Sequence, residues 1–351
     1  MAVQRILIHE FLEKSNAGLV FDVRSPAEYT HAHIPGAISL PLFTDEERKI
    51  VGTLYKQKSR EAAIKAGLDF FGPKMKSMVE TVEAYCEQIK KEGKPTVFLY
   101  CWRGGMRSGA VSWLLDLYGF KVYTLSGGYK SFRNHVLQSF NQSYSFKILG
   151  GFTGSGKTEV LKELEKQGQP VIDLEALASH KGSAFGKHKM PPQPTQEMFE
   201  NLLSTALRKF SNHSTERPVW LEDESQRIGD VNIPKSLWTI MRNSPVIFLE
   251  IPFEERLNHI VEEYGDYPKE KLISGIERIS KRLGPQHAKA AIGLLDEGNI
   301  KEAFRILLLY YDKRYLKGLH SRENLSALLT RFPCEKVDSL NARILTKHQS
   351  V

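Results

Sequence analysis

The sequence contains few cysteines and no long hydrophobic run. Only three of its 351 residues are cysteine, at the widely separated positions Cys86, Cys101 and Cys334. Such a set forms neither a disulfide framework nor a four-ligand zinc site. No run approaches the ~20 apolar residues that span a bilayer, and the first residues lack the pattern of a secretory leader. We therefore expect a cytoplasmic protein without membrane contact, whose cysteines are either buried or reactive.

Negatively charged residues are fewer than positively charged ones, and the excess of positive charge is unevenly distributed along the chain. The chain has 49 Lys and Arg against 41 Asp and Glu, a net charge of +8. Residues 268–351 hold 16 Lys and Arg against 9 Asp and Glu, so most of the excess lies in the last quarter. Such a surface attracts a polyanion, but charge alone favours the simpler interpretation of a solvated helical face.

Strand-like and helix-like segments alternate along the chain, a pattern typical of parallel sheets in α/β proteins. Helical spacing separates the apolar runs, and after Phe253 the sequence predicts helices almost to its end. The expected strands lie at 19–23, 37–41, 95–101, 121–128, 146–151, 170–175, 217–225 and 244–251.

A polar stretch at 135–145 interrupts this alternation and marks an expected domain boundary. We predict one α/β domain at 1–138 and a second at 144–267. The basic helical region at 268–351 would continue the second domain.

A glycine-rich turn, GFTGSGKT, occupies 151–158 between a predicted strand and a predicted helix. It matches the pattern G-x-x-x-x-G-K-[ST], in which backbone N–H groups and a helix N-terminus surround a phosphate. The lysine adds a full charge, and the last threonine a hydroxyl for phosphate or Mg²⁺. The phosphate-binding candidates are Gly151, Thr153, Gly154, Ser155, Gly156, Lys157 and Thr158.

Acidic residues end the strand-like run that follows this turn. Glu222, Asp223 and Glu224 stand where a nucleotide hydrolase holds Mg²⁺, and Asp173 is a weaker candidate of the same kind. The simpler interpretation is a solvated strand end. A phosphate loop indicates a phosphorylated ligand, and it does not identify that ligand as ATP.

A cysteine also lies at a junction between strand and helix, in the stretch YCWRGGMRSG at 100–109. A reactive cysteine must be a thiolate, and nearby cations and a helix N-terminus lower the pKa of a thiol. Cys101 has Arg103 and Arg107 close by in sequence, with glycines that let the loop curl around the sulfur. We therefore interpret Cys101 as catalytic, whereas Cys86 and Cys334 lack such surroundings and are expected to be structural.

The N-terminal part resembles the rhodanese domains. The resemblance rests on DVRSPAEYTHAHIPGAISLP at 22–41 and on CWRGGMRS at 101–108. Rhodaneses carry a chalcogen on the cysteine of this loop. Here Arg107 follows Cys101 by six positions, one more than in the short rhodanese loop, which implies room for a group larger than bare sulfur.

Four motifs together make the whole chain similar to the tRNA 2-selenouridine synthases: CWRGGMRS, GGFTGSGKTE, HKGSAFG and LEDESQRIG. This resemblance implies a rhodanese-like α/β domain followed by a P-loop NTPase-like α/β domain with a helical C-terminal region. It also implies two reactions on wobble 2-thiouridine, namely S-geranylation from geranyl diphosphate and then replacement by selenium from selenophosphate.

The same resemblance implies partners and residue roles. The partners would be tRNAs of the Lys, Glu and Gln type and a selenophosphate supplier, with no tightly bound cofactor and Mg²⁺ left open. Cys101 would transfer selenium, Arg103 and Arg107 would stabilise the thiolate or selenophosphate, and the acidic residues would hold Mg²⁺ or activate the base. The further candidate substrate contacts are His180, Ser183, Phe185, Arg278 and Arg282.

Three other functions fit the same residues, one of them a binding module that senses oxyanions. In an ATP-dependent tRNA sulfurtransferase, the phosphate loop would activate the uridine and Cys101 would supply persulfide sulfur. In a small-molecule kinase with a non-catalytic rhodanese domain, Cys101 would be dispensable.

Overall fold

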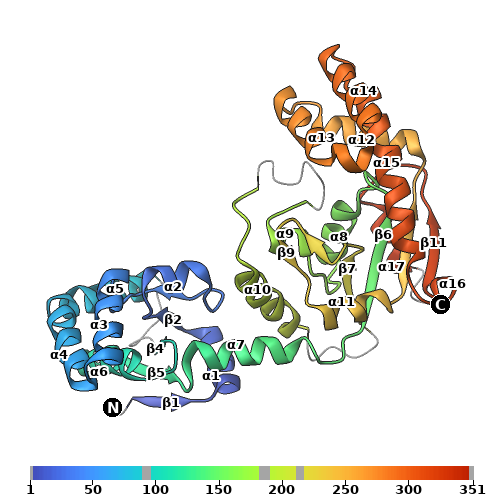
Figure 1. Ribbon diagram of the computed structural model, residues 1–351. Helices are drawn as coiled ribbons and strands as arrows, with labels where there is room; N and C mark the ends of the chain where they lie inside the picture. Colours follow the sequence, from blue (N-terminus) through green and yellow to red (C-terminus); the bar gives the residue numbers. More distant parts are fainter. Residues whose placement is uncertain (1–2, 89–95, 182–189, 211–216, 348–351) are drawn as a thin grey trace. The chain divides into compact units, whose positions relative to one another are not determined.

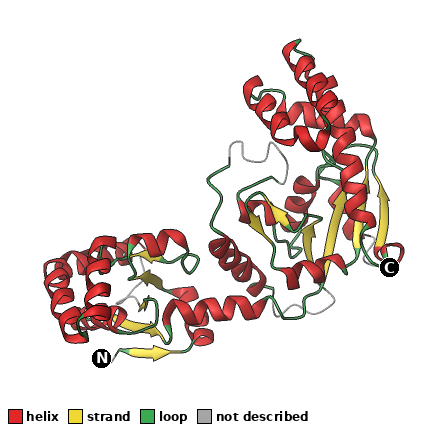
Figure 2. Cartoon of the chain, in the orientation of Figure 1, coloured by secondary structure: helices red, strands yellow, loops and turns green. Residues whose placement is uncertain are grey.

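The structure, a computed structural model, describes residues 3–88, 96–181, 190–210 and 217–347. The chain divides into two compact units (Figure 1). The first comprises Met1–Ser139 together with Glu200–Thr205, and the second comprises Phe140–Phe199 together with Ala206–Val351. Each unit contains a parallel sheet with helices around it, which confirms the predicted α/β class (Figure 2).

The first unit is built on a five-stranded sheet with the strand order β1-β5-β4-β2-β3, and every neighbouring pair is parallel. Its strands are β1 (Gln4–Ile6), β2 (Leu19–Asp22), β3 (Ile38–Ser39), β4 (Thr96–Tyr100) and β5 (Lys121–Leu125). Its α-helices are α1 (Ile8–Lys14), α2 (Pro26–His31), α3 (Asp45–Gln57), α4 (Arg60–Phe71), α5 (Met75–Gln88), α6 (Met106–Tyr118) and α7 (Gly128–Ser139).

The core of this unit follows from its strand composition. A central parallel strand is covered on both faces and therefore reads as a continuous apolar run. In β4, four of the five residues of TVFLY are buried. Val97 and Leu99 from this strand pack with Val111 and Leu115 of α6. This packing sets the end of β4, and hence the cysteine after it, against the start of α6.

The second unit contains a four-stranded parallel sheet with the order β11-β10-β6-β7, and a short antiparallel hairpin. Its strands are β6 (Phe146–Gly151), β7 (Val219–Glu222), β8 (Arg227–Ile228), β9 (Val231–Asn232), β10 (Val246–Glu250) and β11 (Leu329–Pro333). Its α-helices are α8 (Lys157–Lys166), α9 (Leu174–Ala178), α11 (Lys235–Arg242), α12 (Phe253–Tyr264), α13 (Lys269–Leu283), α14 (Pro285–Asp296), α15 (Ile300–His320), α16 (Leu325–Leu328) and α17 (Asn341–Lys347). Helix α10 (Gln196–Arg208) is divided between the units, because its residues Glu200–Thr205 belong to the first.

The helices α12 to α15 share an apolar core of their own. Leu257 from α12, Ile276 from α13, Ala291 from α14 and Phe304 from α15 belong to one buried cluster. The long helix α15 leaves this bundle and runs back beside the sheet (Figure 1). The basic C-terminal region is therefore packed against the same sheet that carries the glycine-rich turn.

The prediction of helices from Phe253 almost to the end of the chain is wrong in one place. Leu329–Pro333 forms strand β11, which pairs with β10 over its whole length. In LTRFP, buried and exposed residues do not alternate, because β11 is the edge strand of the sheet and most of its residues remain accessible. A strand that is paired on one side only leaves a weak hydrophobic signal.

Two other segments differ from expectation. In the expected strand at 170–175, only Val171 makes a β-bridge, because Asp173 caps the following helix α9. The polar stretch at 135–145 begins inside α7, which continues to Ser139. Among the described residues, no helix has the length and apolarity required to cross a membrane.

Candidate functional site

The cysteine loop, residues 101–108, joins β4 to α6 and is fastened to the start of α7. The Tyr129 N–H donates to the carbonyl of Cys101 at 2.8 Å, and the Lys130 N–H donates to the carbonyl of Trp102 at 3.0 Å. Residues 101–108 are called the thiol loop below. Its position is therefore set by backbone hydrogen bonds rather than by flexible side chains.

Two glycines make this fastening sterically feasible. Gly104 and Gly128 have φ values of +63° and +59°, in the left-handed region. A Cβ atom on Gly128 would lie 2.3 Å from the Cys101 carbonyl oxygen, and one on Gly104 would lie 2.5 Å from the Leu125 oxygen. Any side chain at either position would push the thiol loop away from α7.

The thiol at the centre of the loop is buried but polar in its surroundings. Cys101 is 3% exposed, and its Sγ lies 3.3 Å from the Ser108 hydroxyl oxygen. Burial raises the pKa of this thiol, but hydrogen bonding by Ser108 and the Gly105 backbone and the charge of Arg107 outweigh it, so the pKa lies below its ordinary value. This environment favours a thiolate.

The two arginines of the loop differ in their surroundings. Arg107 forms a two-pronged ion pair with Glu28 of α2, at 2.6 Å and 3.4 Å. Although burial raises the pKa of Glu28, Arg107 holds it below its ordinary value, so this carboxylate is charged beside the loop. Arg103 is exposed. Part of the positive charge expected at the sulfur is thus balanced by Glu28.

A buried ion pair supports the loop from within the unit. Arg24 is bound by Asp22 at 2.6 Å and donates to the Ala32 carbonyl at 2.6 Å. Its guanidinium lies 3.9 Å from the centre of the Tyr129 ring. Because the Tyr129 backbone holds Cys101, the motif DVR at 22–24 stabilises the platform on which the thiol loop rests.

The glycine-rich turn at 151–158, called the phosphate loop below, joins β6 to α8. Gly154 and Gly156 have φ values of +80° and +71°. A Cβ atom on Gly154 would lie 2.7 Å from Ile260 Cγ1 and 2.9 Å from the carbonyl oxygen of Arg256. The apex of the phosphate loop therefore packs tightly against α12.

A buried arginine fixes the phosphate loop to two helices. Arg256 of α12 donates to the Thr153 carbonyl at 3.1 Å, and it forms a two-pronged ion pair with Asp312 of α15 at 2.9 and 2.7 Å. The Arg256 side chain is 3% exposed. This guanidinium is satisfied by protein groups and acts as a positioning residue.

The loop lysine lies among oxygen atoms. Lys157 Nζ donates to the carbonyl oxygens of Gly151 and Phe152 at 3.0 and 3.4 Å, and it lies 3.5 Å from Glu222 Oε1. The Ser155 hydroxyl is buried with no hydrogen-bond partner among the described residues. A phosphate oxygen is the kind of ligand that accepts hydrogen bonds from both groups.

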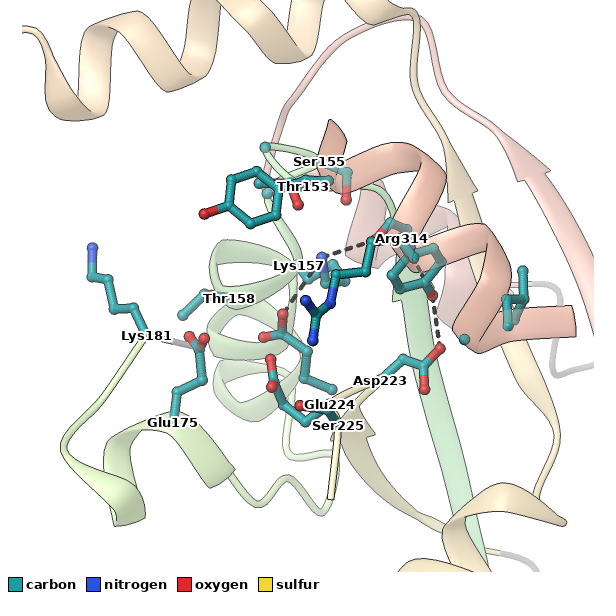
Figure 3. Close-up of a pocket in the computed structure, with 18 of the residues that line it drawn as sticks. Thr153, Ser155, Lys157, Thr158, Glu175, Lys181, Asp223, Glu224, Ser225 and Arg314 are labelled. Atoms are coloured by element: carbon teal, nitrogen blue, oxygen red, sulfur yellow. Dashed lines mark hydrogen bonds and ion pairs between the residues drawn. The ribbon is translucent and has the colours of Figure 1, made fainter. Parts of the chain in front are cut away.

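A cavity of about 500 Å³ opens in front of this loop (Figure 3). Besides the phosphate loop, its walls come from α9, α11, α12 and α15. The lining combines cations and carboxylates with the aromatic side chains Trp238, Tyr264, Tyr311 and Tyr315. Such a mixture suits a ligand with an anionic end and an apolar end.

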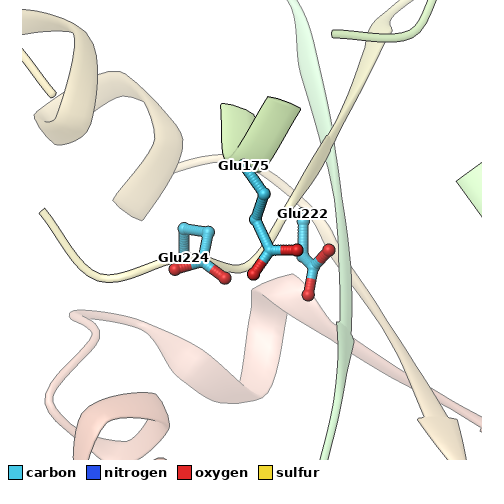
Figure 4. Close-up of side chains that lie close together, drawn as sticks. All are labelled: Glu175, Glu222 and Glu224. Carbon is cyan, nitrogen blue, oxygen red and sulfur yellow. The ribbon is translucent and has the colours of Figure 1, made fainter. Parts of the chain in front are cut away.

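Three carboxylates converge in this cavity: Glu175, Glu222 and Glu224 (Figure 4). One carboxylate oxygen from each lies within 4.8 Å of the others. Burial and the neighbouring carboxylates raise the pKa of Glu175 to about 10 and that of Glu224 to about 8. Burial also raises the pKa of Glu222. We call these residues the carboxylate trio; the chemistry of the set fits a divalent cation, which would remove the repulsion.

The side chains of the other two acidic candidates, Asp223 and Asp173, are bonded to protein groups. Asp223 accepts a hydrogen bond from the Tyr315 hydroxyl at 2.7 Å and forms an ion pair with Arg322. The Gly151 N–H in turn donates to the Tyr315 oxygen at 3.2 Å. Asp173 accepts from the Ala176 N–H at 2.8 Å and caps α9. Asp223 thereby links β7 to the phosphate loop.

The remaining candidates are distributed differently. His180 is buried and is not among the residues that line the cavity, whereas its neighbour Lys181 lines it. Ser183 and Phe185 lie outside the described residues. Arg278 and Arg282 are exposed on α13 and do not line the cavity.

Sequence reasoning missed several cavity residues. Glu175, Trp238, Tyr311 and Arg314 belong to no motif, and tertiary packing brings them together. A signal for the α15 face existed, because Tyr311, Arg314 and Tyr315 follow helical spacing.

Known proteins resemble this chain over both of its units. A family model described as the tRNA 2-selenouridine synthase AAA domain matches residues 144–332, and the rhodanese-like domain matches residues 7–135. A tRNA 2-selenouridine synthase of Nitrosomonas europaea is 39% identical over 70% of this chain and 63% of its own length. A tRNA 2-selenouridine synthase of Hydrogenovibrio crunogenus is 37% identical over 84% of this chain and 88% of its own length.

A solved structure matches part of the chain. It is the crystal structure of the N-terminal domain of a putative ATP/GTP binding protein from Clostridium difficile 630. The sequence of that domain is 38% identical to this chain, the match covers 39% of this chain and 99% of the domain, and the TM-score is 0.35.

Proposed function

Because the chain belongs to the tRNA 2-selenouridine synthase family, we propose that it modifies tRNA, converting wobble 2-thiouridine to 2-selenouridine in two transfers. The observation that carries the proposal is the presence in one chain of a polar thiol loop and a complete phosphate loop that faces a cavity. The first transfer would use geranyl diphosphate and the second selenophosphate.

The cavity at the phosphate loop suits the first transfer. The thiocarbonyl sulfur of the base would attack C1 of the prenyl chain, the C1–O bond would break, and its electron pair would leave on diphosphate. The base would then lose its N3–H proton to give the neutral S-geranyl form. Lys157, the N-terminus of α8 and the phosphate loop would stabilise that leaving group. Aromatic side chains such as Tyr264 and Tyr311 would contact the apolar chain. Such a reaction requires no hydrolysis of ATP.

Alkylation prepares the base for the second transfer. A thiocarbonyl sulfur is a poor leaving group. After alkylation, the selenium of selenophosphate would bond to C2 while the C2–S bond breaks, and the sulfur would leave as geranyl thiolate and take up a proton. Water would then cleave the P–Se bond and release orthophosphate. We assign selenium transfer to Cys101. Cys101 is almost fully buried, while the neighbouring Trp102 and Arg103 are exposed.

A divalent cation has suitable ligands beside the phosphate loop. The carboxylate trio would hold Mg²⁺, which when bound supplies positive charge next to the diphosphate. The chain's own contribution is to keep these carboxylates close to Lys157, which lies 3.5 Å from Glu222.

The basic helices would contact the tRNA backbone. Arg278, Lys281 and Arg282 are exposed on α13, and phosphate contacts of this kind weaken steeply as the salt concentration rises. We expect the affinity for tRNA to fall between low and high salt. Salt-independent binding would remove α13 from the tRNA footprint.

The test uses the full-length protein and tRNA that carries 2-thiouridine. With geranyl diphosphate and no ATP, mass spectrometry of the digested nucleosides should show S-geranyl-2-thiouridine. Subsequent addition of selenophosphate should convert it to 2-selenouridine. A strict requirement for ATP, with sulfur rather than selenium incorporated, would instead establish the ATP-dependent sulfurtransferase.

A further inference from the structure

One face of α15 brings a cation into the cavity that no sequence motif marks. Tyr311, Arg314, Tyr315, Gly318 and Leu319 all line the cavity, at the spacing of residues on one side of a helix. Figure 3 shows the Arg314 side chain extending from α15 toward Lys157 and Glu224. The basic region that the sequence associates with tRNA therefore also contributes to the cavity at the phosphate loop.

Arg314 differs from the other arginines near the cavity in its bonding. Arg242, which also lines the cavity, donates to the Gly318 carbonyl and the Ser321 hydroxyl oxygen at 3.0 Å. Arg256 and Arg322 are buried in ion pairs with Asp312 and Asp223. Arg314 is exposed, and its hydrogen bond within the described part of the chain is a 3.3 Å contact with the Tyr310 hydroxyl. Its guanidinium therefore retains several N–H donors for a ligand.

The charges of the cavity require a second cation for a multiply charged anion. Lys157 lies 3.5 Å from Glu222, and the other two carboxylates of the trio stand nearby. A diphosphate carries several negative charges, and Lys157 alone does not balance them. Of the other cations of the lining, Lys181 is paired with Glu263, and Arg242 donates to the Gly318 carbonyl and the Ser321 hydroxyl oxygen.

We propose that Arg314 is a catalytic residue that binds the second phosphate of a diphosphate substrate, the first being held by the phosphate loop. This inference rests on the proposed geranyl transfer. When the C1–O bond breaks, the electron pair moves onto the diphosphate, and the planar guanidinium neutralises charge on its outer oxygens. A ligand with two linked phosphates uses both the phosphate loop and Arg314, so we expect the cavity to bind it more tightly than orthophosphate.

The test measures the binding of inorganic pyrophosphate and of orthophosphate to the full-length protein by calorimetry. We expect the wild-type protein to prefer pyrophosphate. Arg314→Gln should weaken pyrophosphate binding about 10- to 100-fold, the usual effect of a lost charge-assisted hydrogen bond, and leave orthophosphate binding nearly unchanged. The matched control is Lys313→Gln, which removes a neighbouring exposed charge that does not line the cavity.

A conservative variant separates charge from geometry. Arg314→Lys keeps the charge but loses the planar fork, so its pyrophosphate affinity should lie between those of Arg314→Gln and the wild type. Equal pyrophosphate binding by Arg314→Gln and the wild type would overturn the assignment, as would a wild-type protein without preference for pyrophosphate.

The geranylation assay keeps this inference distinct from the proposed function. A wild-type protein that transfers the geranyl group, combined with an Arg314→Gln variant of full activity, would refute the role of Arg314 alone. A wild-type protein whose pyrophosphate preference depends on Arg314, but which transfers no geranyl group, would refute the geranyl transfer and support the phosphate assignment.

Discussion

The thiol loop and the phosphate loop are both glycine-containing turns between a parallel strand and a helix, yet they are completed in different ways. The thiol loop closes largely on itself, through Ser108, the Gly105 backbone and the α7 N-terminus. The phosphate loop faces a cavity whose other walls come from helices as far along the chain as α15.

The difference extends to electrostatics. At the thiol loop the charges are compensated, because Arg107 pairs with Glu28 and hydrogen bonds lower the pKa of the thiol. At the phosphate loop, three carboxylates with raised pKa values face Lys157 and Arg314. The first site holds its charges in balance within the fold, whereas at the second burial and mutual repulsion raise the pKa values of neighbouring carboxyl groups.

The largest expected effect separates the two sites by removing the thiol. Cys101→Ser should reduce the formation of 2-selenouridine by more than about 1,000-fold, because the hydroxyl is a far weaker nucleophile at neutral pH. S-geranylation by the same protein should continue at the wild-type rate. Cys86→Ser, in the half-buried part of α5, is the control and should retain both activities. Normal selenation by Cys101→Ser would exclude the thiol from the transfer.

The converse substitution acts on the phosphate loop. Lys157→Ala should slow geranylation about 100- to 1,000-fold, because the leaving diphosphate loses a charged donor. Selenation of tRNA that has been geranylated beforehand should be unaffected. Lys166→Ala, with a side chain that is 75% exposed at the far end of α8, provides the control. If both reactions survive in Lys157→Ala, the phosphate loop serves another ligand.

A smaller effect tests the charge balance at the thiol loop. Arg107→Gln removes a cation that lowers the thiol pKa and leaves Glu28 without its closest cationic partner, so both changes raise the pKa of Cys101. The pH profile of alkylation by iodoacetamide should therefore move to higher pH, with a rate at pH 7 that is about 3- to 10-fold lower. Arg103→Gln should produce a smaller shift, because Arg103 is exposed to solvent. Equal shifts would show that Arg107 has no special position.

The smallest expected effect concerns the stability of the carboxylate trio. The folded-state pKa of Glu224 is raised to about 8, so its contribution to stability is complete below the unfolded pKa and is lost as the pH rises through 8. Glu224→Gln should match the wild-type Tm at pH 5 and exceed it by several degrees at pH 8.5, where the wild-type side chain is charged in the folded state. Mg²⁺ should raise the wild-type Tm more than that of the variant.

The control for this measurement is Glu165→Gln, a substitution on the exposed side of α8. It removes one carboxylate without touching the trio, and its Tm should follow that of the wild type at both pH values. If Glu224→Gln and the wild type still differ in Tm at pH 5, the effect of the substitution is due to packing and not to charge repulsion.

Sequence reasoning was most successful where a function depends on neighbouring residues. The strands that lead into both loops are continuous apolar runs, and the glycines after them are required by backbone geometry. It was least successful at β11, because an edge strand shows no alternation of buried and exposed residues. It also failed at Asp173, which caps helix α9 and does not end a strand.

By itself, the sequence determined the α/β class, the two anion-binding turns and the identity of the residues inside them, because backbone hydrogen bonds and glycine conformations act over a few residues. Only the tertiary structure decided that Glu28 balances Arg107, that Asp223 is engaged by Tyr315 and Arg322, and that Glu175 and Arg314 reach the phosphate loop. These pairings depend on how helices pack across a sheet, and charge interactions between side chains distant in sequence leave no local pattern.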